Sequence, residues 1–278
     1  MRIMTSNIWG DYFGNEVSSR ENGIFSVFEK YDADVIGLQE VTESWYKSRL
    51  FKNLSENYNF VGTEIFNSRN HTPLAIKKEY SIIANGYERL CDTPDKSKSI
   101  TWAVVENKDY RFAVCNTHFW WMNGQQSEAD KKILFPVVGD LAYADAETHN
   151  KLRTKNAEQM SSLMKRLSEK YSCAVFAFGD MNTTISAEVF KIYKENNIHH
   201  LWDDAPEKDY MCSIHGNPER GEDGLFHGKK TTDDYILSID HIVGLGKNFS
   251  VSRYRLAEDQ EALDATDHSP VYADIVLK

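Results

Sequence analysis

The 278-residue sequence lacks the features that would tie it to long nucleic acids or to membranes. It contains no run of three or more consecutive Lys or Arg, and its net charge is −10 at pH 7. A protein that grips duplex nucleic acid usually shows a basic face, so the composition argues against that partner, although a local patch stays open. No stretch approaches the roughly 20 apolar residues of a membrane span, and the first residues hold no apolar signal-peptide core. We therefore expect a soluble protein of the cytoplasm.

Cysteine is scarce as well, and its spacing carries no metal or redox motif. The four cysteines are scattered and form no Cys-x-x-Cys pair, which argues against a zinc site or a disulfide framework. Cys115 and Cys173 lie within apolar segments and fit small core side chains. Apolar residues make up 41% of the sequence, enough for a substantial core, and no repeat or linker divides it. We expect one domain over residues 1–278, and a monomer.

What the sequence does contain is a series of apolar segments that each end in a polar residue. The clearest is segment 174–178, which stops at Gly179 and is followed by Asp180 and Asn182. Each such residue has an ordinary reading as a turn residue, a helix start or a core histidine. Because chemistry in α/β sheets gathers at strand ends, a common site explains the whole series better. Its members are Asn7, Glu40, His118, Asp180, Asn182, Asp240, Asp267 and His268.

The remaining pattern predicts a mixture of strands, helices and two long loops. Residues 148–171 carry apolar side chains at helical spacing and predict the strongest helix. Ser18 and Glu21 fit a capping box, so another helix is expected to start there. Regions 122–147 and 203–234 are polar and irregular, and we expect long loops. Strands are predicted at residues 2–9, 34–41, 58–65, 74–77, 81–90, 100–106, 111–118, 174–178, 235–243 and 271–277.

The polar series suits metal-assisted hydrolysis of a phosphoester. A hard cation such as Mg²⁺ takes oxygen ligands, usually one or two carboxylates with several waters. Glu40 can supply the main carboxylate, with Asn7 and Asp267 in support. Attack on phosphorus also needs an activated water and donors for the developing charge, and Asp240 can orient His268 as the base. We therefore predict a site for Mg²⁺ or Mn²⁺.

The order of these motifs resembles the endonuclease/exonuclease/phosphatase superfamily, whose members have the DNase I-like fold. No single motif carries the resemblance, because all of the signature stretches occur in order between residues 3 and 277. Phe226-His227-Gly228 also resembles a stretch that precedes the Asp240 motif in a bacterial subgroup. The signature stretches are Asn7, Gln39-Glu40, Thr117-His118, Gly179-Asp180-x-Asn182, Ile239-Asp240-His241-Ile242 and Thr266-Asp267-His268-Ser269-Pro270.

The resemblance implies a fold and a role for each motif. The fold would be of the α/β (α+β) class: a four-layer αββα sandwich, with two mostly antiparallel sheets flanked by helices. Asp180 would hold the attacking water or the outer coordination sphere of the metal, and Asn182 would hydrogen-bond a phosphate oxygen. His118 would contact the scissile phosphate, and Asp240 would pair with His268. Which histidine is acid and which is base stays open.

Two departures from the superfamily pattern bear on the activity. Trp9 stands where the abasic-site nucleases carry Asp, and His241 stands where Tyr or Trp often follows the motif's Asp, so a DNA-repair role is disfavoured. We predict a metal-dependent phosphoester hydrolase, a phosphodiesterase, with a DNA or RNA nuclease as the nearest alternative. A glycosidase would not need His118, Asp240 and His268 together, and a non-catalytic binding module would need a broken site.

The predicted substrate contacts rest on weaker patterns. Lys229 and Lys230 follow His227 and could attract a phosphate, although isolated surface charges usually contribute little. Trp120, two residues after His118, could wall a compact pocket, with core packing as the alternative. Given the net charge of −10, we expect small phosphodiesters to be preferred over duplex DNA.

Overall fold

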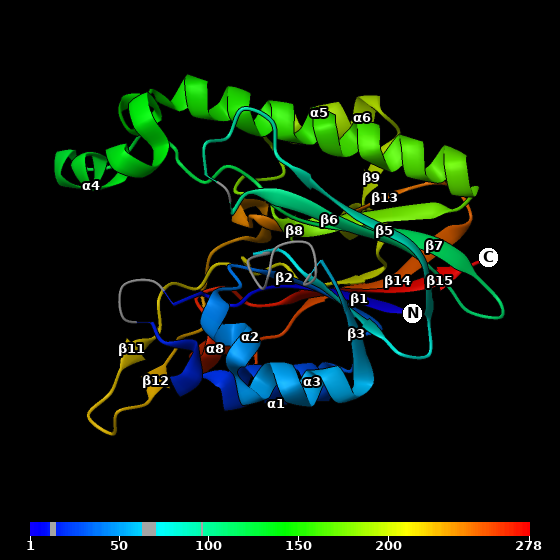
Figure 1. Cartoon of the computed structure of the whole chain (residues 1–278), viewed down its shortest axis with the longest axis horizontal. Helices are drawn as coiled ribbons and strands as arrows, with labels where there is room; N and C mark the ends of the chain where they lie inside the picture. Colours follow the sequence, from blue (N-terminus) through cyan, green and yellow to red (C-terminus); the bar gives the residue numbers. More distant parts are fainter. Residues whose placement is uncertain (12–14, 63–70, 96) are drawn as a thin grey trace.

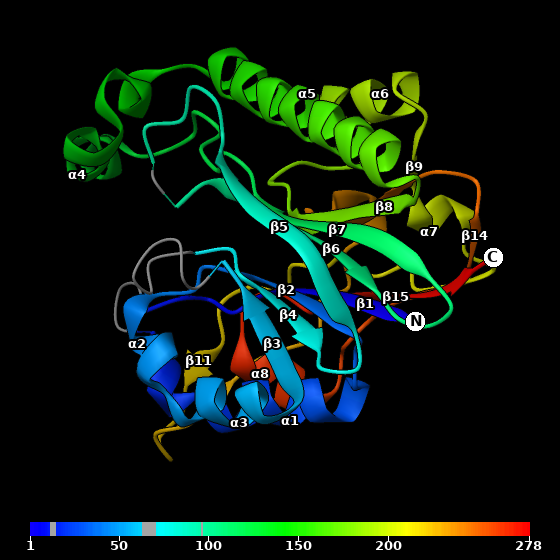
Figure 2. The same cartoon turned by 45° about the vertical axis from the view of Figure 1, so that its right-hand side comes forward.

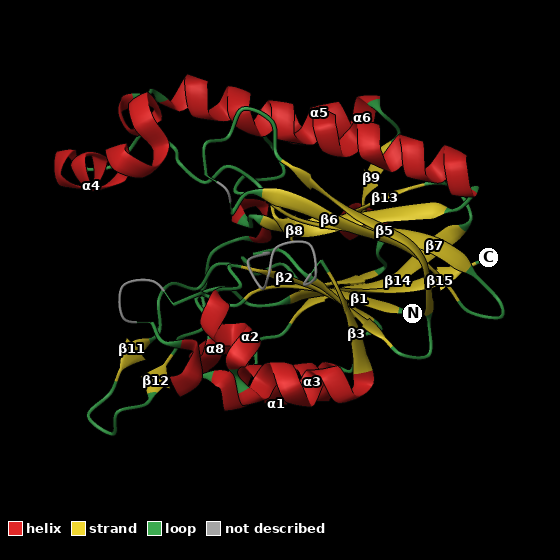
Figure 3. Cartoon of the chain, in the orientation of Figure 1, coloured by secondary structure: helices red, strands yellow, loops and turns green. Residues whose placement is uncertain are grey.

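Two large β-sheets pack face to face, with helices on both outer faces, in the computed structural model of the chain (Figures 1 and 3). The structure describes residues 1–11, 15–62, 71–95 and 97–278. Most strand pairs are antiparallel; β1 with β2, β7 with β8 and β10 with β14 are parallel. This arrangement is the predicted four-layer αββα sandwich, and the prediction of the fold is confirmed.

The first sheet contains the N-terminal strand at its centre. Within the described residues it has seven strands. In spatial order they are β10 (Glu207–Lys208), β14 (Phe249–Leu256), β15 (Val271–Leu277), β1 (Arg2–Asn7), β2 (Val35–Gln39), β4 (Leu74–Lys77) and β3 (Tyr58–Val61).

The second sheet is built around the predicted strand that leads to Asp180. The part of it that the structure describes has six strands, and a separate two-stranded hairpin joins β11 (Glu219–Arg220) to β12 (Phe226–His227). In spatial order the six are β5 (Ser81–Arg89), β6 (Ser99–Glu106), β7 (Arg111–His118), β8 (Ala174–Asp180), β13 (Asp240–Leu245) and β9 (Ile198–His200).

Helices cover the two sheets from opposite sides. Figure 2 shows α1 and α3 against the seven-stranded sheet and α5 and α6 against the six-stranded sheet. None of the helices in the described residues is long and apolar enough to cross a membrane. The helices are α1 (Glu21–Tyr31), α2 (Glu43–Lys47), α3 (Arg49–Asn57), α4 (Glu128–Val138), α5 (Ala146–Tyr171), α6 (Glu188–Glu195), α7 (Leu201–Asp204) and α8 (Gln260–Ala265), with 3-10 turns η1 (Val17–Ser19), η2 (Gly139–Tyr143) and η3 (Tyr235–Leu237).

Three apolar layers hold this arrangement together. The central one lies between the sheets and includes Phe112, Phe176 and Tyr254. The outer two lie between each sheet and its helices, around Trp45 on one side and Met160 on the other. At about 25 cal/mol per Å² of buried apolar surface, such layers are the main favourable term in folding. The sheets are therefore a rigid frame for the residues at their ends.

The expectation of a long loop at 122–147 is wrong for most of that region. Ser127 caps α4 by accepting a hydrogen bond from the backbone N–H of Asp130 (3.1 Å), and η2 follows directly. The helix was hidden in the sequence because its apolar side chains do not form one buried stripe. Ile133 and Val137 are exposed, while Val138 packs under the helix.

Other boundaries also differ from expectation. The capping box at Ser18 does not form: Ser18 lies in η1, and α1 begins at Glu21 without a side-chain cap. The predicted strand 235–243 starts as η3 and becomes a strand only at Asp240. Strand β14 and helix α8 were not predicted at all. The predicted strand 58–65 ends at Val61, and its residues 63–65 lie outside the described residues.

Candidate active site

Three neighbouring strands of the six-stranded sheet bring His118, Asp180 and Asp240 together. In the strand register, His118 at the end of β7 faces Asp180 at the end of β8, and Asp180 faces Asp240 at the start of β13. The Nε2 atom of His118 lies 3.4 Å from Oδ2 of Asp180. Gly179 has φ of +147°, and a Cβ there would collide with the carbonyl of Thr117, so this close approach requires glycine.

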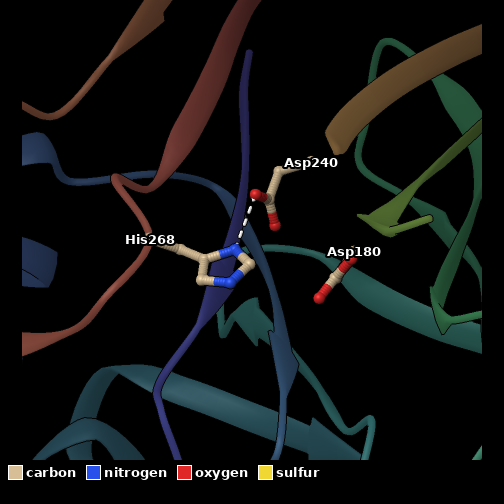
Figure 4. Close-up of side chains that lie close together, drawn as sticks. All are labelled: Asp180, Asp240 and His268. Atoms are coloured by element: carbon tan, nitrogen blue, oxygen red, sulfur yellow. Dashed lines mark hydrogen bonds and ion pairs between the residues drawn. The ribbon is translucent and has the colours of Figure 1, made fainter. Parts of the chain in front are cut away.

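Asp240 and His268 form the predicted pair. The Nδ1 atom of His268 donates to Oδ2 of Asp240 at 2.8 Å, and Ser213 Oγ donates to the same oxygen at 2.7 Å. Figure 4 shows the carboxylates of Asp180 and Asp240 directed toward the ring of His268. The bond at Nδ1 leaves Nε2 of His268 facing the site, 3.9 Å from Oδ1 of Asp267.

The seven-stranded sheet contributes Asn7 and Glu40 from its adjacent parallel strands. Asn7 ends β1 and Glu40 follows β2, so the two meet at one edge of the sheet. The Nδ2 atom of Asn7 donates to Glu40 Oε1 and to Asp180 Oδ2, both at 3.2 Å. Asn7 thus links the ends of both sheets. The site lies at the end of the sandwich opposite the chain termini (Figure 1).

Asn182 completes the group around Asp180. Its backbone N–H donates to Oδ1 of Asp180 at 2.9 Å, and its side-chain Nδ2 donates to the carbonyl of Phe119 at 3.2 Å. Asn182 has φ of +49°, a conformation that asparagine adopts more readily than most residues. The structure therefore brings together all eight polar residues that the sequence nominated for catalysis and metal binding.

Burial and crowding shift the ionisation of these groups in opposite directions. Burial and the neighbouring Asp240 raise the pKa of Asp180 to about 7. Burial and the Lys98 ammonium hold the pKa of His118 well below its usual range. Burial alone would lower the pKa of His268, but Asp240 and Asp267 together raise it well above its usual value. The pKa values of the two histidines are therefore shifted in opposite directions.

Lys98 is a member of the site that the sequence analysis missed. Its side chain is buried, and Nζ donates to Nε2 of His118 at 2.8 Å. Glu40 and Asp180 lie within electrostatic reach of the ammonium, while burial lowers the pKa of Lys98. The available signal was a lysine directly before the apolar strand 99–106, a place where a surface lysine is unremarkable.

His215 is the second residue that was missed. The His-Gly pattern occurs twice, and the copy next to the site is Ile214-His215-Gly216, not the one around His227. Ile214 pairs with His268 in an isolated bridge, and the His215 N–H donates to the carbonyl of Asp267 at 3.2 Å. Both ring nitrogens of His215 are buried without a hydrogen-bond partner among the described residues.

Three of the four predicted substrate contacts are bonded to side chains outside this cluster. His227 belongs to the exposed β11–β12 hairpin and pairs with Asp223 at 3.0 Å. Lys230 pairs with Glu258 at 2.5 Å, and Lys229 is exposed. Trp120 is completely buried, with Nε1 donating to Nδ1 of His149 at 2.9 Å. This burial argues against contact between Trp120 and a substrate, and core packing explains it.

The donor atoms of the site fit a divalent cation. Oδ1 of Asp240 and Oδ1 of Asp267 are buried and have no hydrogen-bond partner among the described residues. A buried carboxylate oxygen without a partner is costly, and a cation would satisfy it. Ligand atoms of Asp180, Asp240 and His268 lie within 4.8 Å of one another. Oxygen donors predominate, as hard cations prefer.

Comparison with known proteins supports the fold. No protein-family model matches the sequence, and no curated protein matches it significantly. Among solved structures, an endonuclease/exonuclease/phosphatase family protein from Bacteroides thetaiotaomicron has a TM-score of 0.74 at 18% identity, over 100% of this chain and 98% of that one.

Two further structures carry more specific names. A mannosyl-6-phosphatase from Bacteroides thetaiotaomicron has a TM-score of 0.70 at 17% identity, over 100% of both chains. Truncated TDP2 from Caenorhabditis elegans has a TM-score of 0.66 at 14% identity, over 100% of this chain and 97% of that one. The chain therefore has the DNase I-like fold of the endonuclease/exonuclease/phosphatase proteins, as the order of its motifs predicted.

Proposed function

We propose that the chain is a divalent-metal-dependent phosphoester hydrolase that acts on small phosphodiesters. The observation that carries this proposal is the meeting of two different kinds of group at one end of the sandwich. Asn7 joins Glu40 to Asp180, and next to them Asp240 holds His268 at 2.8 Å. Oxygen ligands for a cation thus adjoin an oriented imidazole, which is the combination that hydrolysis at phosphorus requires.

Glu40, Asp267 and Asn7 are the residues that we assign to the metal. When bound, Mg²⁺ or Mn²⁺ would polarise a phosphoryl oxygen as a Lewis acid. For Asn7 this role requires its Oδ1 atom, which in this structure accepts from the backbone N–H of Trp9 at 3.0 Å. Its Nδ2 contacts to both carboxylates give Asn7 a second role, which is to space Glu40 from Asp180.

The remaining residues move protons and bind the phosphate. Asp240 fixes the proton of His268 on Nδ1, so Nε2 can exchange a proton with water or with the leaving oxygen. Asp180 is placed to orient the attacking water. Lys98, His118 and Asn182 provide donors for the charge that develops on the phosphoryl oxygens, a term often worth several kcal/mol. The group that contacts the substrate's leaving oxygen is the acid, and the other is the base.

A small substrate is favoured over duplex DNA by the charges around the site. The net charge is −10, and His227 and Lys230 are each paired with an acidic side chain. Of the residues that were expected to attract a phosphate, His227 and Lys230 are thus paired, and Lys229 is exposed. The structural likeness to a mannosyl-6-phosphatase also supports a compact substrate, so phosphomonoesters belong beside phosphodiesters in any test.

A metal-dependent activity screen tests the proposal directly. The purified chain would be assayed with EDTA, Mg²⁺ or Mn²⁺ against sugar phosphates, phospholipid head-group diesters, single-stranded RNA and duplex DNA. We expect hydrolysis of a small phosphodiester that requires the metal. Metal-independent turnover, or turnover of none of these substrates, would contradict the proposal.

The salt dependence of substrate binding separates a small substrate from a polymer. Log affinity falls with log salt by about 0.9 per phosphate contacted on duplex DNA. We expect a slope near −1 or shallower for the preferred substrate. Tight duplex binding with a slope of roughly −5 or steeper would replace the proposal with a nuclease.

A further inference from the structure

Arg20 is a buried arginine whose hydrogen bonds all go to backbone carbonyls. It precedes α1 and is only 3% exposed. Its guanidinium donates to the carbonyls of Ile8 at 3.0 Å and Asn15 at 2.8 Å, and also to those of Trp9 and Ala265. Starting helix α1 would not require an arginine bonded to four carbonyls.

These carbonyls belong to the two segments next to Asn7 and Asp267, which are two of the three proposed metal ligands. Ile8 and Trp9 follow Asn7 directly, and the next N–H, that of Gly10, donates to Oε2 of Glu40 at 3.2 Å. Ala265 ends α8, two residues before Asp267. One guanidinium therefore fastens the end of β1 to the segment that presents Asp267.

The arrangement is energetically demanding, which argues that it does more than close loops. Trp9 has φ of +51°, a strained conformation for a non-glycine residue. A buried charge also needs compensation. Here it comes from the carbonyl dipoles, from the nearby carboxylates of Asp267 and Glu40, and from the rings of Trp9 and Phe226, 4.8 and 5.9 Å from the guanidinium carbon. The Nε atom has no hydrogen-bond partner among the described residues.

We propose that Arg20 is the positioning residue of the metal site, which keeps Glu40, Asn7 and Asp267 facing one cation. The inference rests on the proposed function, because it takes these three residues as the metal ligands. Arg20 would act through the hydrogen-bond fork, which a lysine cannot reproduce. Residues that orient metal ligands are typically worth about 10–100-fold in metal affinity.

The charge of Arg20 makes the test decisive. A fixed positive charge near a cation site repels the cation, so losing the charge alone would tighten Mg²⁺ binding. Losing the fork would loosen it. Arg20→Lys removes the fork and keeps the charge, whereas Arg20→Gln removes both. Arg153→Lys is the matched control, because Arg153 is also buried and donates to the carbonyls of Trp120 and Met122.

Calorimetric titration of each full-length variant with Mg²⁺ alone, well below its melting temperature, provides the measurement. We expect Arg20→Lys and Arg20→Gln to weaken Mg²⁺ affinity by about 10-fold or more. Arg153→Lys should lower the melting temperature and leave the affinity at the wild-type value. Should Arg20→Gln fail to fold, Arg20→Lys decides, since it changes only the fork.

Three results would overturn the inference, and they have different meanings. Wild-type affinity in both Arg20 variants, with only a lower melting temperature, would show a purely structural role. Tighter binding in Arg20→Gln together with wild-type binding in Arg20→Lys would show that the charge alone acts. A wild-type protein that binds neither Mg²⁺ nor Mn²⁺ would remove the proposed metal dependence along with the role of Arg20.

Discussion

Two buried pairs of histidines differ in how completely the polar atoms around them are satisfied. In the first pair, His200 Nε2 lies 3.0 Å from His241 Nδ1, and His241 Nε2 donates to the carbonyl of Thr183 at 2.8 Å. His200 Nδ1 accepts from the backbone N–H of Trp202 at 3.2 Å. All four ring nitrogens are therefore bonded, and the bonds fix both tautomers.

The second pair, His118 and His268, lies beside Asp180, and several charged groups are buried around it. The ammonium of Lys98 contacts His118, and the carboxylates of Asp180 and Asp240 are buried side by side. Among the described residues, Oδ1 of Asp240 has no hydrogen-bond partner although it is buried. The first pair is therefore fully hydrogen-bonded, whereas the second lies beside a buried carboxylate oxygen that has no partner among the described residues.

This difference separates a structural site from a functional one. Buried polar groups are normally satisfied, and exceptions mark places where a ligand, ion or reaction intermediate supplies what is missing. Changes in the second pair should therefore reduce activity and leave stability nearly intact. Changes in the first pair should reduce stability and spare the chemistry. Each prediction below tests that contrast.

The largest effect is expected at the Asp240–His268 pair. His268→Ala should lower kcat by about 10²–10⁴-fold, the usual worth of a positioned acid or base. Asp240→Asn should also lower turnover, because His268 loses the acceptor that fixes its tautomer. The measurement is steady-state kinetics on the substrate found by the screen.

The double variant provides the control for that prediction. Since the two residues act as one unit, Asp240→Asn combined with His268→Ala should be little worse than His268→Ala alone. Losses that multiply would mean that the two residues act independently, and the pairing would then have no catalytic meaning.

Lys98→Met should separate activity from stability most clearly. The variant removes a charge donor 2.8 Å from Nε2 of His118, and loss of one such donor costs about 10²–10³-fold in kcat. Unfolding in denaturant should show an unchanged or higher free energy, because a buried ammonium opposes folding. A large loss of stability with retained activity would show that the role of Lys98 is structural.

Glu40→Gln should weaken Mg²⁺ binding and activity together, by about 10–100-fold in affinity. The side chain is isosteric, and Glu40 lies at a strand end with only partial burial, so the melting temperature should change little. Calorimetry with Mg²⁺ checks the affinity. An unchanged affinity would exclude Glu40 as the main ligand.

The two sheets and the polar cluster could be predicted because both produce local patterns in the sequence. A strand such as Ala174–Asp180 is continuously apolar until it ends in polar residues, and a sheet gathers such ends at one edge. Helix α5 has a regular apolar stripe. Asp180, Asp240 and His268 could therefore be placed together before the fold was known.

The residues that were missed had no such signal. Lys98 precedes a strand like many surface lysines, and only tertiary packing buries it against His118. His215 shared its His-Gly pattern with His227, and nothing local indicated which copy reaches the site. Trp120 could not be assigned from the sequence, because an aromatic residue close to His118 fits a pocket wall and core packing equally well. His241 could be recognised as a departure, but its partner His200 lies 41 residues away.

The smallest effect on activity is expected at His241, where the contrast predicts a change in stability instead. His241→Phe leaves Thr183 O and His200 Nε2 without their partner, which should cost about 1–3 kcal/mol near neutral pH. Turnover should stay closer to wild type than in any of the four single site variants. Denaturant unfolding and kinetics on the same samples check both statements.

The pH dependence of that loss is the sharper test. Burial lowers the pKa of His241 to about 4, whereas a histidine in the unfolded chain titrates near 6.5. As the pH falls below about 6.5, the unfolded chain binds a proton that the folded chain refuses, so wild type loses about 3 kcal/mol through His241 by pH 4. The Phe variant has no such group, and its deficit relative to wild type should shrink steadily between pH 6.5 and 4.5. A deficit that stays constant over this range would mean that His241 is not held neutral by its burial. It would contradict the structural role assigned to the first pair.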